Sequence, residues 1–237
     1  MITHPESWSV IGQPIGIKEI EETILQTVAR IGCRNLSFSG GLDSSLMLYF
    51  MTRVFCKVSV FTIGFPKTHP DIEYSRLVVK KLGSVEHKIY IPTADEMAEE
   101  AGKKPDPDVA VRLFYKFLAR QKVSGIIACD GIDEFMAGYY DHQQHPDEGT
   151  YYKYIWRLQD DHLKPLDKNS GSIKVYLPYL DNSVLLLLSQ IPISEKVDSE
   201  NRKKIMIRMA RGKIPDEVIK RWKYGFCDAL EIKKIRF

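Results

Sequence analysis

The chain has 237 residues, of which 44% are hydrophobic and 27% charged, as in an ordinary globular protein with a substantial core. Lysine and arginine number 34 against 31 aspartates and glutamates, and this net charge of +3 is too small to predict nucleic-acid binding. Apolar runs such as Val184 to Leu188 are far shorter than a membrane span, and the first residues do not resemble a signal peptide. We therefore expect a cytoplasmic protein with no nucleic-acid and no membrane partner.

Helices and strands alternate through the first part of the chain. Isoleucines 20 and 24 and Val28 share one face of the first predicted helix. Strands that alternate with helices of ten or more residues predict crossover connections and a mostly parallel, twisted sheet in an α/β fold, with helices on both faces. The predicted helices cover residues 17–31, 42–54, 72–82 and the segment after Pro107, and the predicted strands cover residues 35–38, 57–64, 86–91 and the segment from Gly125.

The strand signal fades from Tyr151 onward, and helices dominate the rest of the chain. We therefore expect a single domain, residues 1–237, with an α/β nucleotide-binding core over about 1–145 and a mostly helical substrate or lid part over about 146–237. The segment 145–150 is typical of an exposed loop or hinge. Four scattered cysteines form no Cys-x-x-Cys pair and predict buried thiols, rather than a zinc site or disulfides: Cys33, Cys56, Cys129 and Cys227.

A Ser-Gly-Gly turn, residues 39–41, stands between a predicted strand and a predicted helix. Glycines let the backbone approach a ligand closely, and the helix that follows offers unpaired N–H groups to an anion such as phosphate. The hydroxyls of Ser39, Ser44 and Ser45 could donate further hydrogen bonds, and Asp43 is placed to hold Mg²⁺ beside a phosphate. Alternatively, the turn is a glycine-tolerant loop before a capped helix, which many α/β proteins contain.

Five blocks in order resemble a known family. Residues 37–45, SFSGGLDSS, resemble the Ser-Gly-Gly-x-Asp-Ser loop of the ATP pyrophosphatase superfamily, whose members cleave ATP between its α- and β-phosphates. Residues 130–140, DGIDEFMAGYY, resemble the signature of the synthetase domain of asparagine synthetases, and residues 160–170, 177–181 and 204–226 resemble later segments of that family. The resemblance covers nearly all of the chain from residue 36 to residue 226 and implies an adenine nucleotide α-hydrolase-like fold.

The resemblance implies that the first turn binds the β- and γ-phosphates of ATP. Asp43 and Asp133 would share Mg²⁺ on the pyrophosphate, although Asp133 could instead cap a helix. Gly131 would line the nucleotide site, and the backbone of Ile63 and Gly64 would contact adenine, or these two residues simply end a core strand. The implied phosphate-binding residues of the first turn are Ser39, Gly40, Gly41, Asp43, Ser44 and Ser45.

Two further residues match positions that act on the reacting groups in this family. Asp130 would position the incoming amine or accept its proton, and it could also be a structural turn aspartate. Lys223 matches a lysine on a mobile segment that reaches the phosphates and stabilises transition-state charge, whereas an exposed lysine in a basic tail is the ordinary alternative. Lys204 and Arg208 fit the same block, but a solvated helix face explains them nearly as well.

The implied activity is an ATP- and Mg²⁺-dependent ligase that adenylates a carboxylate and releases pyrophosphate. Ammonia or an amine then displaces AMP to form an amide. Between Asp167 and Asp181 the segment is shorter than usual and lacks the family's Glu-x-Arg, which leaves open whether aspartate or a related acid is activated. A β-lactam or carbapenam synthetase-like reaction and a catalytically silent nucleotide-binding subunit remain alternatives, and a homo-oligomer is allowed.

Full-length asparagine synthetases resemble this chain only in their second half, since their first half is a glutaminase whose nucleophile is the cysteine after the initiator methionine. Here Ile2 follows Met1, and Cys33 is expected to pack as a small buried hydrophobe. We therefore expect the chain to use free ammonia or a primary amine, with glutamine serving only through a separate glutaminase subunit.

Overall fold

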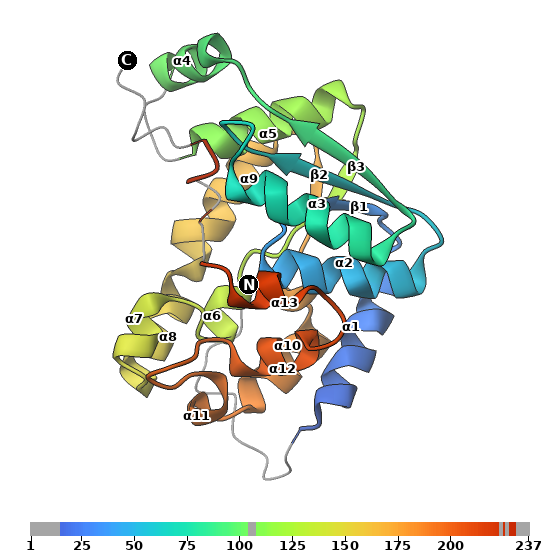
Figure 1. Cartoon of the computed structure of the whole chain (residues 1–237). Coiled ribbons are helices and arrows are strands. Elements are labelled where there is room, and N and C mark those ends of the chain that lie inside the picture. The colour runs from blue at the N-terminus through green and yellow to red at the C-terminus, as the bar shows by residue number, and fades with distance from the viewer. Residues whose placement is uncertain (1–14, 104–107, 223–224, 226–227, 231–237) are drawn as a thin grey trace.

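A parallel five-stranded sheet forms the centre of the computed structural model (Figure 1), which describes residues 15–103, 108–222, 225 and 228–230. The strand order is β3-β2-β1-β4-β5, and Leu36 of β1 lies opposite Val60 of β2 and Ile127 of β4. The strands are β1 (Asn35–Ser37), β2 (Val58–Ile63), β3 (Val85–Tyr90), β4 (Gly125–Ile127) and β5 (Lys174–Tyr176). The chain therefore runs from β1 toward one edge of the sheet and later resumes at β4 toward the other.

Helices connect these strands and make up most of the rest of the described chain. The helix α1 illustrates the local rules, because Ile20, Ile24 and Val28, spaced four residues apart, are buried and the helix ends at Gly32, which has a φ of 70°. The helices of the first part are α1 (Ile17–Ile31), α2 (Leu42–Val54), α3 (Pro70–Leu82), α4 (Ala94–Lys103), α5 (Val109–Arg120), α6 (Ile132–Phe135) and α7 (Tyr140–Gln144). The later ones are α8 (Glu148–Leu158), the π-helical turn η2 (Gln159–Leu163), α9 (Lys164–Ser170), the 3₁₀ turn η3 (Pro178–Leu180), α10 (Asn182–Gln190), α11 (Ile193–Lys196), α12 (Lys204–Ala210) and α13 (Asp216–Lys220).

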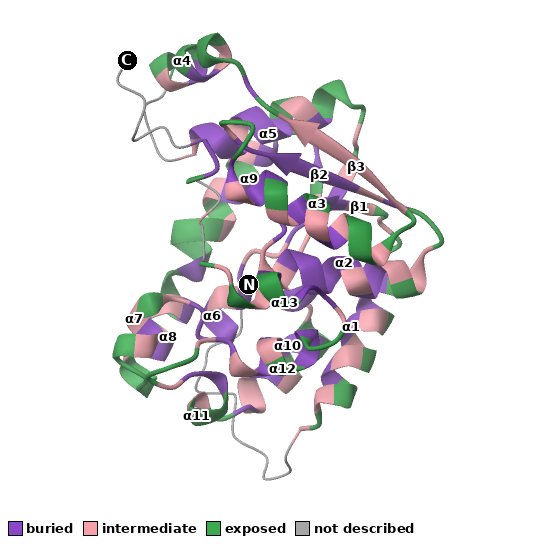
Figure 2. Cartoon of the chain, viewed as in Figure 1, coloured by how far each residue is buried: buried purple, intermediate pink, exposed green. Residues whose placement is uncertain are grey.

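Both faces of the sheet are covered, which explains the near-continuous apolar sequence of β2. Val58 and Val60 point into a core shared with α1 and α2, whereas Phe61 and Ile63 point into a second core shared with α5. Successive side chains of a strand point to opposite faces, so this division follows from the alternation alone. Buried residues on both sides of β2 are visible in Figure 2. The predicted α/β class with helices on both faces is confirmed.

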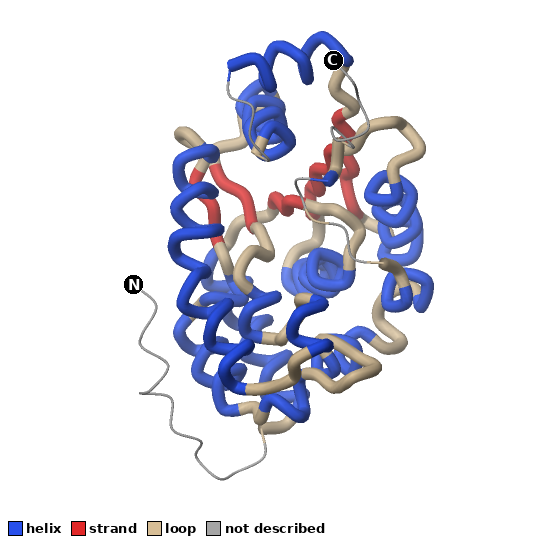
Figure 3. Tube along the Cα trace, turned by 90° about the vertical axis from the view of Figure 1, so that its left-hand side faces the viewer, coloured by secondary structure: helices blue, strands red, loops and turns tan. Residues whose placement is uncertain are grey.

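Most of the later helices gather away from the sheet, whereas α9 packs on α5 and β5. Figure 1 shows α6, α7 and α8 together with α10 to α13 in the lower half of the molecule, below the sheet. The helices α1 and α2 link the two halves, because α1 packs on α10 and α2 packs on α12. Figure 3 shows the same helical layer from the side, beneath the strands.

The structure departs from the sequence prediction in several places. The part expected to be helical also supplies β5, a three-residue strand that the fading strand signal hid, and α4 is an additional helix. The segment 145–150 is mostly exposed, as expected, but Asp147 caps α8 by accepting a hydrogen bond from the Thr150 amide at 2.9 Å. Cys56 is exposed rather than buried, while Cys33 and Cys129 are partly buried. Cys227 lies outside the described residues.

Within the described residues, no helix combines the length and the apolar character needed to cross a membrane.

Candidate active site

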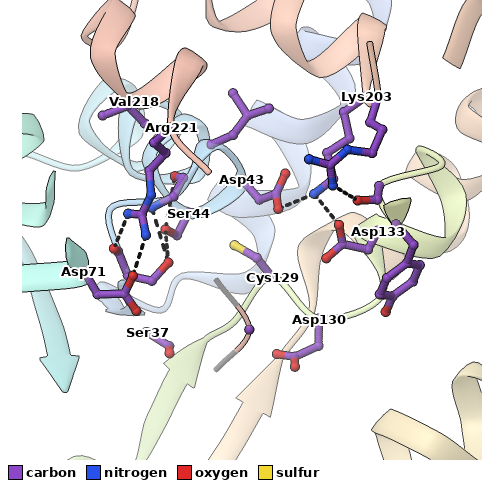
Figure 4. A pocket seen from close by; sticks show the side chains of 18 of the residues that line it. Ser37, Asp43, Ser44, Asp71, Cys129, Asp130, Asp133, Lys203, Val218 and Arg221 are labelled. Carbon is purple, nitrogen blue, oxygen red and sulfur yellow. Dashed lines mark hydrogen bonds and ion pairs between the residues drawn. The ribbon is translucent and has the colours of Figure 1, made fainter. Parts of the chain in front are cut away.

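A large pocket opens at the carboxyl ends of β1 and β4, the two neighbouring strands from which the chain runs in opposite directions across the sheet. Open parallel sheets bind ligands at such a position, because the loops after the two strands diverge there. The pocket has a volume of about 1140 Å³. Residues of the Ser-Gly-Gly turn, of the turn after β4, of η2 and of the segment before α12 line it. Figure 4 shows its labelled side chains.

The turn after β1 presents hydroxyl and amide groups to this pocket. The Gly41 amide donates to Ser39 Oγ at 3.3 Å, and the hydroxyls of Ser39 and Ser44 lie 3.3 Å apart at the start of α2. Gly40 serves a different purpose, because a Cβ there would lie 2.3 Å from the backbone nitrogen of Ser75 and its φ is 66°. The turn therefore needs Gly40 to pack against α3, while Ser39, Gly41 and Ser44 line the pocket.

Two carboxylates and one ammonium meet at the centre of the pocket. Lys203 Nζ lies 2.5 Å from Asp43 Oδ2 and 2.7 Å from Asp133 Oδ1, and only 8% of the Lys203 side chain is exposed. Burial alone would lower the pKa of Lys203, but the charges of the two carboxylates outweigh it and hold this pKa above its ordinary value. Asp43 lies in the first turn of α2 and Asp133 in the first turn of α6, the helices that follow β1 and β4, so the pairing of these strands brings the two carboxylates together.

The backbone fixes Lys203 in this position. It precedes α12 with φ 53° and ψ 38°, a left-handed conformation that is unusual for a residue with a side chain. The neighbouring Arg202 donates a hydrogen bond to the Gly138 carbonyl at 2.7 Å. A Cβ on Gly138 would lie 2.0 Å from Asp133 Oδ1 and 2.3 Å from Lys203 Cε, so a larger residue there would displace these two side chains.

A second set of titratable groups lines the pocket beside Asp130. Tyr139 Oη donates to Glu134 Oε1 at 2.7 Å, and His162 Nε2 lies 3.3 Å from the tyrosine oxygen and 3.5 Å from the same carboxylate oxygen. Burial raises the pKa of Glu134, and the charge of Asp133 raises it further. Burial also raises the pKa of Asp130. Carboxyl groups with raised pKa values are suited to accept a proton.

The segment that follows α13 is tied to α3 by a buried ion pair and to the Ser-Gly-Gly turn by a hydrogen bond. Arg221 Nη2 lies 2.5 Å from Asp71 Oδ1, and its Nη1 donates to the Ser39 carbonyl at 3.1 Å. Both side chains of the ion pair are 5% exposed, and the guanidinium lies over the Tyr74 ring. Burial raises the pKa of Asp71, and the charge of Arg221 opposes that rise. These contacts hold Trp222, which lines the pocket, at its mouth.

Comparisons with known proteins agree with this architecture. The asparagine synthase family model matches residues 34–168 and 140–236. The chain belongs to the asparagine synthase family. It is 26% identical over 223 residues to a protein of Acanthamoeba polyphaga mimivirus named "Probable asparagine synthetase (glutamine-hydrolyzing)", in an alignment that covers 84% of this chain and 40% of the viral protein. The chain thus spans less than half the length of that relative.

A solved structure shows the same fold. NMN synthetase from Francisella tularensis superposes with a TM-score of 0.51 at 10% sequence identity, covering 90% of this chain and 78% of the other. At this identity the likeness shows the fold alone. It supports the expected adenine nucleotide α-hydrolase-like sheet, while the family match confirms the resemblance to the synthetase domain of asparagine synthetases.

The structure brings most of the residues that the family resemblance singled out to one pocket. Those that line it are Ser39, Gly41, Asp43, Ser44, Ile63, Asp130, Gly131 and Asp133. Gly131 has a φ of 89°, and a Cβ there would lie 2.6 Å from Leu180, so its turn requires glycine. Gly40, Ser45 and Gly64 do not line the pocket; Ser45 is wholly buried in α2, and a Cβ on Gly64 would lie 2.9 Å from Ile72. Lys223 lies outside the described residues.

Asp43 and Asp133 fit a magnesium ion that is also held by phosphate oxygens. Carboxylate oxygens are hard ligands, and Mg²⁺ is commonly bound by one or two carboxylates together with substrate phosphates. The Lys203 ammonium already marks a position between the two carboxylates where a cation is stable. The N-cap residue of α6 is Gly131, and Asp133 lies in the first turn of that helix. Among the described residues, no cluster of three or more acids, histidines or cysteines could hold a metal by itself.

The sequence analysis gave no role to several side chains that line the pocket. It weighed Lys204, which instead binds Asp198 and the Ser194 carbonyl, while the preceding Lys203 enters the site. The left-handed backbone of Lys203 directs its side chain into the pocket, whereas the side chain of Lys204 points away from it. No local sequence pattern predicts this left-handed residue. The other missed residues are Asp71, Glu134, Tyr139, His162 and Arg221.

Proposed function

We propose that the chain is an ATP-dependent ligase that activates a carboxylate by adenylation and forms an amide with ammonia or an amine. One observation carries this proposal. In a member of the asparagine synthase family, the hydroxyl-lined turn after β1 and the carboxylates Asp43 and Asp133 converge on a single cation position at the switch point of the sheet. A polyphosphate needs both features, since anionic oxygens require donors and a bound metal requires carboxylates.

One end of the pocket would bind the phosphates of ATP and the metal ion. The Ser39 and Ser44 hydroxyls and the start of α2 would bind the phosphates that leave as pyrophosphate. Magnesium held by Asp43 and Asp133 would neutralise the charge that develops on the leaving group. The undescribed Lys223 would add positive charge at the same phosphates, and Arg221 anchors the adjacent backbone to the turn.

The acceptor end of the reaction would lie beside Asp130. This aspartate and Glu134 both have raised pKa values, so either can take the proton that an attacking amine must lose. Tyr139 and His162 contact Glu134 and provide a route by which that proton can leave. Adenylation supplies the leaving group that a carboxylate lacks, and the amine then displaces AMP.

Product analysis tests the proposal. The purified chain is incubated with ATP, Mg²⁺ and a panel of amino acids bearing side-chain or α-carboxylates, including aspartate, with ammonium or with glutamine as the nitrogen source. We expect AMP, pyrophosphate and an amide in matched amounts with ammonium. An acid that yields amide without added ammonium would indicate the intramolecular, β-lactam synthetase-like reaction. Formation of ADP and phosphate would contradict the proposal, and binding of ATP without turnover of any acid would favour the silent subunit.

A further inference from the structure

Lys203 occupies the position between Asp43 and Asp133 that the proposed function gives to a divalent ion. Its Nζ lies 2.5 Å from Asp43 and 2.7 Å from Asp133, and 8% of its side chain is exposed. Figure 4 shows the ammonium between the two carboxylates. Mg²⁺ requires oxygen ligands at about 2.1 Å and repels a nearby ammonium. The two cations therefore exclude each other from this point.

The backbone and the neighbouring residues fix Lys203 in the site. Its backbone is left-handed, and such residues persist where the surrounding structure fixes them. The loop before it is closed by Asp198, whose Oδ1 accepts hydrogen bonds from the Glu200 and Asn201 amides at 3.0 and 2.7 Å. Gly138 leaves room for the side chain, because any Cβ there would overlap Lys203 Cε. The protein thus holds a positive charge of its own at the metal position.

We infer that Lys203 competes with free divalent cations for Asp43 and Asp133, so that the protein takes up the metal together with a nucleotide polyphosphate and binds it weakly beforehand. The role of the nucleotide rests on the proposed function, whereas the competition rests on the geometry of the three side chains. A polyphosphate removes the conflict because its oxygens can hold both the ion and the released ammonium. Lys203 lines the same pocket as Ser39 and Ser44, so the ammonium stays within reach of that ligand.

Binding of Mn²⁺, followed by electron paramagnetic resonance without nucleotide, measures the competition directly. The wild type is compared with Lys203→Gln and Lys203→Asn, and asparagine is the second variant because it tolerates a left-handed backbone. Lys80→Gln is the matched control, since it makes the same change of charge at an exposed lysine of α3. We expect both Lys203 variants to bind Mn²⁺ at least about tenfold more tightly than the wild type, and the control to be unchanged.

A second titration includes the α,β-methylene analogue of ATP, which cannot be cleaved between its α- and β-phosphates. The analogue should strengthen Mn²⁺ binding more in the wild type than in the Lys203 variants, because only the wild type has a competitor to displace. Circular dichroism establishes that each variant is folded.

Equal or weaker Mn²⁺ binding by the folded variants would overturn the inference, as would the absence of Mn²⁺ binding in every protein. The Mn²⁺ titrations measure no turnover, so a negative result there is distinguishable from a negative result in the product analysis that tests the proposed function. A wild type that forms AMP and pyrophosphate while the variants bind Mn²⁺ no more tightly would refute the competition alone. Tighter Mn²⁺ binding by the variants of a chain that forms ADP would refute only the proposed reaction.

Discussion

Replacing Arg221 with methionine tests how the segment after α13 is held to α3 and to the Ser-Gly-Gly turn. The change leaves Asp71 buried without its guanidinium partner, while the methionine stem can still pack on Tyr74. Both charged side chains are 5% exposed and their atoms lie 2.5 Å apart, so the pair is of the buried kind. Removing one member of such a pair costs about 3–5 kcal/mol. We expect the free energy of unfolding to fall by about 3 kcal/mol.

Urea denaturation with a matched surface variant gives the magnitude. Arg157→Met breaks an ion pair with Asp161 at 2.8 Å whose side chains are 59% and 42% exposed, and it should cost at most about 1 kcal/mol. Adding Asp71→Asn to the Arg221 variant should recover part of the loss, because the uncompensated charge is removed.

The loss should also depend on pH. Burial raises the pKa of Asp71, and without Arg221 nothing in the pair opposes that rise. A carboxyl group whose pKa is higher in the folded state than in the unfolded state stabilises the fold at low pH, and this contribution is lost as pH rises. The deficit of Arg221→Met should therefore be larger at pH 8 than at pH 5. A loss below about 1 kcal/mol, or one that is equal at both pH values, would refute the buried-pair account.

Three further predictions concern other parts of the molecule. Asp133→Asn should lower the rate of AMP formation about 100-fold or more while the far-ultraviolet circular dichroism is unchanged, and an unaltered rate would remove this residue from the site. Burial lowers the pKa of Lys196 to about 7, so between about pH 7 and 10 the unfolded state binds more protons than the folded state. The free energy of unfolding of the wild type should therefore rise by up to roughly 1.4 kcal/mol per pH unit in this range. The urea midpoints of Lys196→Met should lack this rise. Gly40→Ala should be far more destabilising in urea than Gly83→Ala, because both have positive φ but only the first Cβ would meet backbone atoms; equal losses would contradict the packing against α3.

The alternating pattern of the sequence predicted the core of the fold because each strand of the first part is either continuously apolar or followed by a helix of sufficient length. The strand β2 was found for this reason. The strand β5 was missed because its sequence, Lys-Val-Tyr, forms no apolar run like that of the equally short β4, and pairing with β4 makes these residues a strand.

The sequence predicted those site residues that directly follow a strand of the sheet. It did not predict site residues that a distant segment of the chain brings to the pocket. Asp43 and Asp133 each follow a strand, so parallel pairing was enough to bring them together. Lys203 lies 160 residues beyond Asp43 in the chain, and its direction depends on one left-handed turn. The sequence pointed to a ligand contact for Gly40, which stays a prediction, but it gave no sign that Gly40 also packs closely against α3, because both uses require a glycine.

Exchange of labelled pyrophosphate into ATP is the most direct test of the proposed chemistry, since only reversible adenylation of a carboxylate returns pyrophosphate to the triphosphate. With a carboxylate substrate and Mg²⁺ but no amine, we predict exchange that requires the acid and is abolished in Asp133→Asn. Acid-dependent exchange of labelled ADP into ATP, with none of pyrophosphate, would show cleavage at the γ-phosphate and contradict the account.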